Sequence, residues 1–473
     1  MIEFLSSMKN NIYKRMKLKL STAICCSMLL PNAIKAQSLE EAVAYTFDSH
    51  PELRMAYLRF KASEKQIEQA KAGYLPTVDL TAGIGYEYTD SPTTRRQGTV
   101  NGDNTAELTR REIGLSLKQE IFSGFHTESE VDRTSSAAKA EQWRLYGMAE
   151  DLALEISKVY VDLIKAKELV TLAELNLNTH QEIYEQIKQR TESGFSSSAD
   201  LSQINGRLAK AHSNLIAAKN NYLDSQVIFY RVTKQRPKNL VTPFPDNYLL
   251  PKTEREGLEI ALKNHPVIKS ASQDIDAARA QHNSAKSAYL PKVSFEVNAN
   301  FNDNLDGEDG STLIGQDVGG KNNEVVAMLR FSYNLFSGGK DDAYAKETAY
   351  KINEAKELNS NVHRQITEGF ILSWNAFEQL NLQKKYIKMH VISSKDTQSD
   401  YKEQFKVGQR SLLDLLDTEN ELYQARRDFL NAEFTEISAQ YRILHAMGRL
   451  VEALRITRPS TWQGESLFAE EVK

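Results

Sequence analysis

The sequence has little of what would cross-link it, interrupt it or carry it through a membrane as helices. It contains 2 cysteines and 11 prolines in 473 residues. The cysteines are neighbours, Cys25 and Cys26, so a disulfide framework is excluded for the rest of the chain. It also lacks a run of about 18 apolar residues, so any membrane crossing has to be made by strands.

An excess of charge of one sign is missing as well. The net charge is −4, without the basic excess that nucleic-acid binding requires, so we expect no nucleic-acid partner. The 9 histidines form no cluster with metal-ligand spacing, and no nucleotide-binding fingerprint is present. We therefore expect no enzymatic activity, no catalytic residues, no cofactor and no metal site.

Residues 1–36 are predicted to be a secretory signal peptide. Basic residues precede a short apolar stretch at 21–30, and Ala36 offers a cleavage site. The apolar stretch is too short to span a bilayer. A lipid-modified cysteine follows a small residue, whereas Cys25 follows Ile24 and Cys26 follows another cysteine, so we expect no lipid anchor.

The chain contains an internal repeat. The His-Pro pair at 50–51 recurs 215 residues later at 265–266, and the Phe-Ser-Gly run at 122–124 recurs 214 residues later at 336–338. Prolines concentrate between the two copies and mark an extended linker. The predicted division is a first repeat over 38–236, a linker over 237–255, a second repeat over 256–455 and a C-terminal tail over 456–473.

Each repeat has two segments in which apolar and polar residues alternate, which predicts β-strands. Each has about ten residues or more and one apolar face, as transmembrane strands have, while Lys118, Glu296 and Arg330 lie on the opposite faces. A soluble hairpin packed on a core is the alternative. Four strands cannot close a sheet in a membrane, so spanning strands require an oligomer. The predicted strands are about 77–89, 108–122, 292–302 and 324–336.

Two long segments without proline, 125–192 and 340–407, predict helices of about 100 Å each. Apolar residues from Leu152 to Ile187 advance by alternating fours and threes, which is the 3.5-residue period of coiled coils. The helix after residue 411 has two such seams, which indicates neighbours on two sides.

The two hairpin tips have matching sequences. Asp200 follows Gly194 by six residues, and Asp414 follows Gly408 by six residues. Each glycine stands where a helix needs a left-handed terminating residue, and each aspartate stands near the start of the next helix, where negative charge is favoured. The predicted tips lie near 193–200 and 407–414.

Four features occur together in this chain: the duplicated order of helix, strand pair and helix, the Leu-Pro before each strand pair, the run at 335–339 and the turn at 407–417. In these four features the chain resembles the TolC family of outer-membrane channel proteins. The likeness runs from about residue 38 to about residue 454. The segment from Glu150 through Val232 is similar to the agglutination-protein branch, which serves type I secretion. The resemblance implies a mainly helical trimer: a twelve-stranded β-barrel in the outer membrane, joined to a twelve-helix tube in the periplasm.

The resemblance also implies a closable aperture at the hairpin tips. By position, Asp414 and Asp417 match the family's acidic ring, Arg410 matches an arginine that helps to hold the tip closed, and Asp200 matches a partner in those contacts. Phe405 departs from the family pattern, which has a tyrosine there. Asp414 and Asp417 lie three residues apart on one helix face, and the alternative is that they are only charges at a helix start.

The expected function is that of a passive exit duct in the cell outer membrane, in contact with outer-membrane lipid. The resemblance implies a periplasmic adaptor and an inner-membrane ABC or other transporter as partners. We expect type I secretion of a large protein such as an adhesin. The alternative use is efflux of small molecules such as drugs or metals, and an alternative of another class is a periplasmic coiled-coil scaffold.

Overall fold

The computed structural model describes residues 37–92, 105–306 and 319–464, so the predicted signal peptide lies outside the described residues. Two copies of the same series of elements follow one another, as the sequence repeat predicts. The first copy comprises α2 (Leu39–Ser49), α3 (Pro51–Lys71), η1 (Ala72–Tyr74), β1 (Thr77–Asp90), β2 (Thr105–Phe122), α5 (His126–Glu192) and α6 (Ser198–Thr233). The second comprises α7 (Glu254–Asn264), α8 (Pro266–Lys286), η2 (Ser287–Tyr289), β3 (Lys292–Asn304), β4 (Gly320–Ser332), α9 (Lys340–Lys406) and α10 (Leu412–Ala446).

The repeated His-Pro pairs separate two helices in each copy. His50 and His265 have extended backbones, with ψ of 126° and 127°, and a proline opens the helix that follows each of them. The proline ring disfavours a helical conformation in the residue before it, but proline fits the first helical position because no N–H is needed there. Each pair therefore ends one helix and begins the next.

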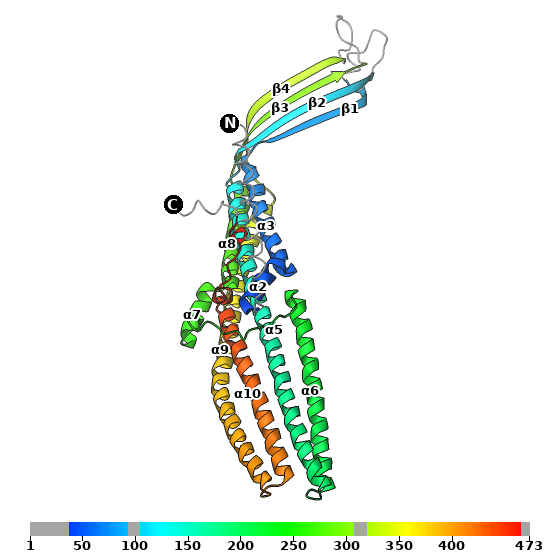
Figure 1. The fold of residues 1–473 in the computed structure, drawn as a ribbon. Coiled ribbons are helices and arrows are strands. Elements are labelled where there is room, and N and C mark those ends of the chain that lie inside the picture. Colours follow the sequence, from blue (N-terminus) through cyan, green and yellow to red (C-terminus); the bar gives the residue numbers. More distant parts are fainter. Residues whose placement is uncertain (1–36, 93–104, 307–318, 465–473) are drawn as a thin grey trace, which may run out of the picture.

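The long helices form a shaft with the sheet at one end and the hairpin tips at the other (Figure 1). Helices α5 and α9 have 67 residues each, so each is about 100 Å long. Near the sheet α5 packs on α3 and α8, and toward the tips it packs on α6 and α10. The predicted 3.5-residue seam is confirmed, because Ile156, Leu163 and Ala173 are buried along one side of α5.

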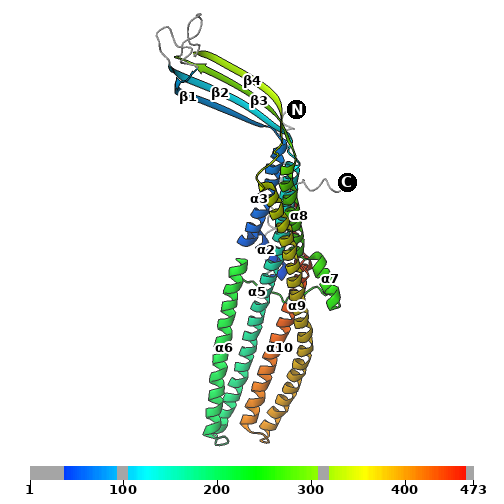
Figure 2. The same ribbon diagram turned by 180° about the vertical axis from the view of Figure 1, so that it is seen from behind.

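Helix α10 has neighbours on two sides, as its two seams predict. It packs against α9 within its own hairpin and against α5 of the first repeat. The hairpins therefore stand side by side in the order α6, α5, α10, α9, which both views show (Figures 1 and 2). None of the helices within residues 37–92, 105–306 and 319–464 is long and apolar enough to cross a membrane.

The four strands form one antiparallel sheet in the order β1-β2-β3-β4. Rows of apolar side chains run across all four strands on one face, for example Leu80, Leu115, Ala299 and Val325. The polar residues Lys118 and Glu296 pair on the other face. The alternation therefore gives the sheet one apolar and one polar face, and β1 and β4 are its edges.

Strand β4 differs from its prediction, since it spans Gly320–Ser332 and not 324–336. Its partner β3 begins at Lys292, directly after a proline without an N–H, so the ladder has no partner beyond Ser332. Asn334 then accepts a hydrogen bond from the backbone N–H of Phe336 at 3.2 Å, which starts a turn. Alternation alone could not find this end, because the apolar residues continue through the turn.

One predicted boundary also shifts. The linker ends before α7, which begins at Glu254 and not after residue 255. The predicted C-terminal tail over 456–473 is described up to residue 464. After α11 (Leu450–Ala453), the chain folds back through η3 (Ser460–Gln463), and Trp462 is buried at 5% exposure against Phe47 and Tyr146.

Candidate functional site at the hairpin tips

The two tips are built alike, as the matching sequences predict. Gly194 and Gly408 have φ of +79° and +78°, a left-handed conformation that favours glycine. The residue after each glycine donates its backbone N–H to a carbonyl in the last helical turn, Phe195 to Arg190 at 2.7 Å and Gln409 to Gln404 at 2.9 Å. Each long helix therefore ends in a closed cap before the next helix begins.

The aspartates at 200 and 414 have the same local role. Asp200 forms a capping box with Ser197, and Asp414 forms one with Ser411. Hydrogen bonds from Ser197, first from its backbone, hold the pKa of Asp200 below its usual value. The side chain and then the backbone of Ser411 do the same for Asp414. Both carboxylates stabilise the start of their own helix.

Asp417 has a different partner from Asp414. Its carboxylate lies 2.7 Å from the guanidinium of Arg207 on α6, and this ion pair joins the two hairpins. The Arg207 side chain is 26% exposed and that of Asp417 is 59% exposed. Although Asp414 and Asp417 stand near each other on α10, one is a helix cap and the other a contact between hairpins.

Phe405 lies in a small hydrophobic core at the tips. It is buried at 8% exposure and packs with residues of all four hairpin helices. The guanidinium of Arg190, from α5, lies 5.3 Å from the centre of the Phe405 ring. The apolar members of this tip cluster are Ile183, Ile187, Ile204, Phe405, Leu412, Leu415 and Leu416. Packing and one ion pair thus hold the two tips together within one chain.

Arg410 contacts its own hairpin in this structure. Its Nε donates to Gln404 at 2.9 Å, and its guanidinium lies 4.2 Å over the ring of Tyr401. Asp200 accepts hydrogen bonds from Ser196 and Ser197. Within one protomer, two of the sequence-predicted residues, Phe405 and Asp417, contact the other hairpin. The other three form contacts within their own hairpin: Arg410, Asp200 and Asp414.

Arg190 and Arg207 were not predicted from the sequence. Comparing the two repeats could not find them, because that comparison shows which positions are equivalent and not which side chains are in contact. The available signal was weaker: Arg207 lies seven residues after Asp200 and therefore on a similar side of α6. Only the packing of α5 on α10 brings these residues together.

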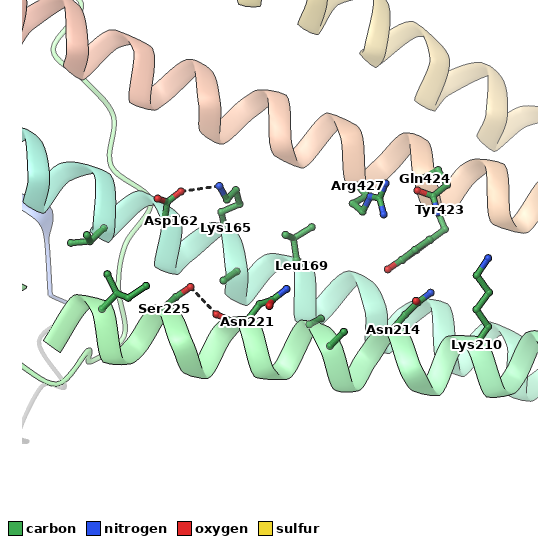
Figure 3. A pocket seen from close by; sticks show the side chains of 15 residues that line it. Asp162, Lys165, Leu169, Lys210, Asn214, Asn221, Ser225, Tyr423, Gln424 and Arg427 are labelled. Carbon is green, nitrogen blue, oxygen red and sulfur yellow. Dashed lines mark hydrogen bonds and ion pairs between the residues drawn. The ribbon is translucent and has the colours of Figure 1, made fainter. Parts of the chain in front are cut away.

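A groove of about 620 Å³ opens above the tips between α5, α6 and α10 (Figure 3). Its lining includes the apolar residues Ala166 and Leu169 and the basic residues Lys210 and Arg427. Lys165, which also lines the groove, is paired with Asp162 at 2.8 Å. This groove could not be predicted from the sequence, because it depends on the spacing of α6 and α10 over α5.

Comparison with known proteins agrees with this architecture. The model of the family described as "Outer membrane efflux protein" matches residues 46–233 and 257–449, one match for each repeat. The outer membrane efflux protein BepC of Brucella suis is 21% identical over 94% of this chain and 92% of its own length. The outer membrane protein TolC of Escherichia coli K12 is 22% identical over 88% of this chain and 83% of its own length.

Solved structures share the fold at low identity. CusC superimposes with a TM-score of 0.74 at 14% identity, covering 87% of this chain and 92% of its own. The CmeC outer membrane channel of Campylobacter jejuni gives a TM-score of 0.72 at 18% identity, covering 87% of this chain and 86% of its own. The chain belongs to the outer membrane efflux protein family, the TolC family, and is a non-enzymatic channel protein of the outer membrane that extends into the periplasm.

Proposed function

We propose that three copies of the chain assemble into an exit duct, with the sheets closing a barrel in the outer membrane and the helical hairpins forming a tube in the periplasm. Family membership speaks against the periplasmic scaffold, because that reading has no place for the sheet. The observation that carries the proposal is a match between two exposed apolar faces at opposite sides of the protomer.

One of these faces is on α6, and we call it the α6 stripe. Its members are separated by multiples of about 3.5 residues, so they lie on one side of the helix, turned away from the seam that packs on α5. They are Ile216, Leu223, Val227 and Tyr230, each 48% to 69% exposed.

The other face is on α9, and we call it the α9 stripe. Its members are Leu372, Leu382, Tyr386 and Met389, each 54% to 68% exposed. Ile216 lies 22 residues after Gly194, and Tyr386 lies 22 residues before Gly408. Because α6 and α9 end the helix order on opposite sides, the stripes would meet at equal height between neighbouring copies. In the proposed trimer, three such head-to-tail contacts, each with a rotation of about 120°, would close the ring.

The sheet supports the same arrangement. Strands β1 and β4 are its edges, and unpaired edge groups are not tolerated in hydrocarbon. In a trimer, pairing β4 of each copy with β1 of the next would supply hydrogen-bond partners to the backbone groups of both edge strands at all three junctions. The apolar face would then contact outer-membrane lipid, and the polar face with Lys118 and Glu296 would line the lumen.

We place the aperture of the duct at the hairpin tips. The two hairpins of one copy are held together by the tip cluster, which includes Phe405, and by the ion pair of Arg207 with Asp417. Arg410 and Asp200 are proposed to contact neighbouring copies. Gly194 and Gly408 form the turns around the opening. Asp414, held by Ser411, is proposed to favour cations there, so Asp414→Ala should lower cation selectivity in planar bilayers without loss of the trimer.

The substrate we propose is a large protein, such as an adhesin, exported by type I secretion with a periplasmic adaptor and an inner-membrane ABC transporter. In support, relatives include the proteases secretion protein PrtF of Dickeya chrysanthemi and the alkaline protease secretion protein AprF of Pseudomonas aeruginosa, at 19% and 20% identity. The second candidate is small-molecule efflux, favoured by the pyoverdine export protein OpmQ of Pseudomonas putida at 22% identity.

Deleting the gene in its native host separates these uses. We expect the deletion strain to lose one or a few large proteins from the culture medium, while its tolerance of drugs and metals is unchanged. Expression of the intact chain should restore secretion. Lowered tolerance with an unaltered set of secreted proteins would favour the efflux duct and overturn the secretion proposal.

A further inference from the structure

Three side chains on one stripe of α5 contact the segment that follows α10. Gln142, Tyr146 and Glu150 are spaced four residues apart, so they lie along one face of the helix. Gln142 donates to the carbonyl oxygen of Trp462 at 2.8 Å, and the Tyr146 hydroxyl donates to the same oxygen at 3.3 Å. Residues 449–463 thus return along α5 instead of leaving the protein.

Glu150 is the most deeply buried member of this stripe, at 1% exposure. One carboxylate oxygen accepts the backbone N–H groups of Leu450 at 2.7 Å and Val451 at 3.2 Å. The other oxygen lies 3.6 Å from the guanidinium of Arg458. Burial raises the pKa of Glu150, and these partners together with His445 counter the rise. The returning segment thus supplies two hydrogen-bond donors to one oxygen of this buried carboxylate and a nearby positive charge to the other.

The returning segment is also anchored by packing. The Trp462 ring stacks near Phe47 with ring centres 6.2 Å apart, and Arg458 lies 4.6 Å over the ring of Tyr146. Leu450 and Val451 are buried at 0% and 1% exposure. The segment is therefore held at both ends, by the bonds of Leu450 and Val451 to Glu150 on α5 and by Trp462 between Phe47 of α2 and Tyr146 of α5.

This junction lies at the end of α10 that is far from the tips. His445 in the last turn of α10 lies 2.8 Å from Asp151 of α5. Gly448, with φ of +67°, then turns the chain so closely past Pro266 that an added Cβ would lie 2.7 Å from that ring. Because α10 has 35 residues, the junction is about 50 Å from the tip, and a rotation of about 5° there would move the tip by about 4 Å.

We propose that residues 449–463 act as a clasp, anchored by Glu150, which holds the far end of α10 on α5 and thereby limits how far the tip of α10 can move. The proposal rests on the aperture described under the proposed function. In a closed duct the clasp restrains one end of α10 and the tip contacts restrain the other. Loosening either end allows the tip of α10 to move over a wider range of positions.

The test compares Glu150→Leu with Glu155→Leu. Glu155 is also on α5 and also forms an ion pair, with Arg231 of α6 at 3.1 Å, but it does not contact the clasp. Glu150→Leu leaves the N–H groups of Leu450 and Val451 without acceptors. Trypsin should therefore cut after Arg449 and Arg455 about tenfold faster or more in this variant. In planar bilayers its openings should be more frequent, and Glu155→Leu should match the wild type in both measurements.

Two results would overturn the clasp: unchanged trypsin cleavage in Glu150→Leu, or faster cleavage with unchanged channel opening. If Glu150→Leu does not assemble, Glu150→Gln and Gln142→Leu decide, and each should give a smaller change in the same direction. Equality of both with the wild type would equally overturn it. The trypsin measurement does not depend on channel activity. A wild-type protein that forms no pores would therefore refute the proposed duct, while the rate of trypsin cleavage would still test the clasp.

Discussion

The guanidinium of Arg207 on α6 lies 2.7 Å from the carboxylate of Asp417 on α10, so one ion pair ties the first helical hairpin of the chain to the second. The resemblance to the TolC family predicts that Asp417, with Asp414, belongs to an acidic ring at the aperture. In the structure the charge of Asp417 is matched by Arg207, and the pair lies beside the tip cluster. Its position favours a role in holding the tips closed.

Arg207→Ser is expected to increase the conductance or the opening frequency of the channel in planar bilayers, because it removes the ion pair between the hairpins. Trimers should survive, since a partly exposed pair contributes about 1 kcal/mol or less. Lys219→Ser is the matched control: it removes the same charge from α6, but its partner Glu174 lies in the same hairpin at 3.0 Å. Equal effects of the two changes would mean that Arg207 does not restrain the aperture.

Phe405→Ala is expected to destabilise the tips locally by about 3 kcal/mol, because it removes a buried ring from the tip cluster. Trypsin should then cut faster after Lys406 and Arg410. Leu413→Ala is the control, since Leu413 is in the same tip but is 47% exposed. Cleavage that is equally slow in both variants would show that the tip does not depend on packing around Phe405.

The stability of the protein is expected to fall in mild acid because of His265. Its side chain is 6% exposed, and burial, with the charge of His445, lowers its pKa from 6.5 to about 4. A lowered folded-state pKa means that the fold favours neutral histidine. Stability is therefore complete above pH 6.5 and is lost as the pH falls toward about 4, by about 3 kcal/mol per chain.

Denaturant unfolding of the wild type and of His265→Gln, between about pH 7 and about pH 4.5, measures this loss. His265→Gln should weaken the pH dependence, whereas His212→Gln, at an exposed position on α6, should leave it unchanged. A pH dependence that is the same in His265→Gln as in the wild type would assign the acid sensitivity to other groups.

Neighbouring residues of β3 should respond differently to an added charge. Val297 belongs to the apolar face and pairs with Leu117 and Ala327, while Asn298 belongs to the polar face. Val297→Arg should lower the stability of the inserted protein by about 2–4 kcal/mol if it lies near the bilayer midplane, and Asn298→Arg should have little effect. Folding into lipid vesicles followed by denaturant titration compares them, and the reverse order of effects would show that the faces are exchanged.

Much of the fold could be predicted because the signals that determine it are short, local sequence patterns. The His-Pro pairs, the Leu-Pro before each strand pair and the tip glycines at 194 and 408 fix where elements begin and end through backbone sterics. The seam of α5 repeats over many turns, so its period is hard to mistake. Such signals need no knowledge of distant contacts.

What could not be predicted depends on packing between distant segments. Arg207 contacts Asp417 only because α5 and α10 lie side by side. The burial of Trp462 likewise depends on its contacts with α2 and α5, which are distant in the sequence. The end of β4 depends on where β3 begins, and not on its own alternation. Asp414 and Asp200 were correctly placed at helix starts, while any contact they make with neighbouring copies remains a prediction.

A pair of introduced cysteines tests most directly whether copies of the chain join through the α6 and α9 stripes. Residues 37–92, 105–306 and 319–464 contain no cysteine. In Ile216→Cys with Tyr386→Cys, the two thiols lie at equal height on helices at opposite sides of one chain, too far apart for a disulfide within it. Oxidation in outer membranes should give covalent trimers on a non-reducing gel, while each single variant stays monomeric after denaturation. Monomers alone from the double variant would contradict the proposed assembly.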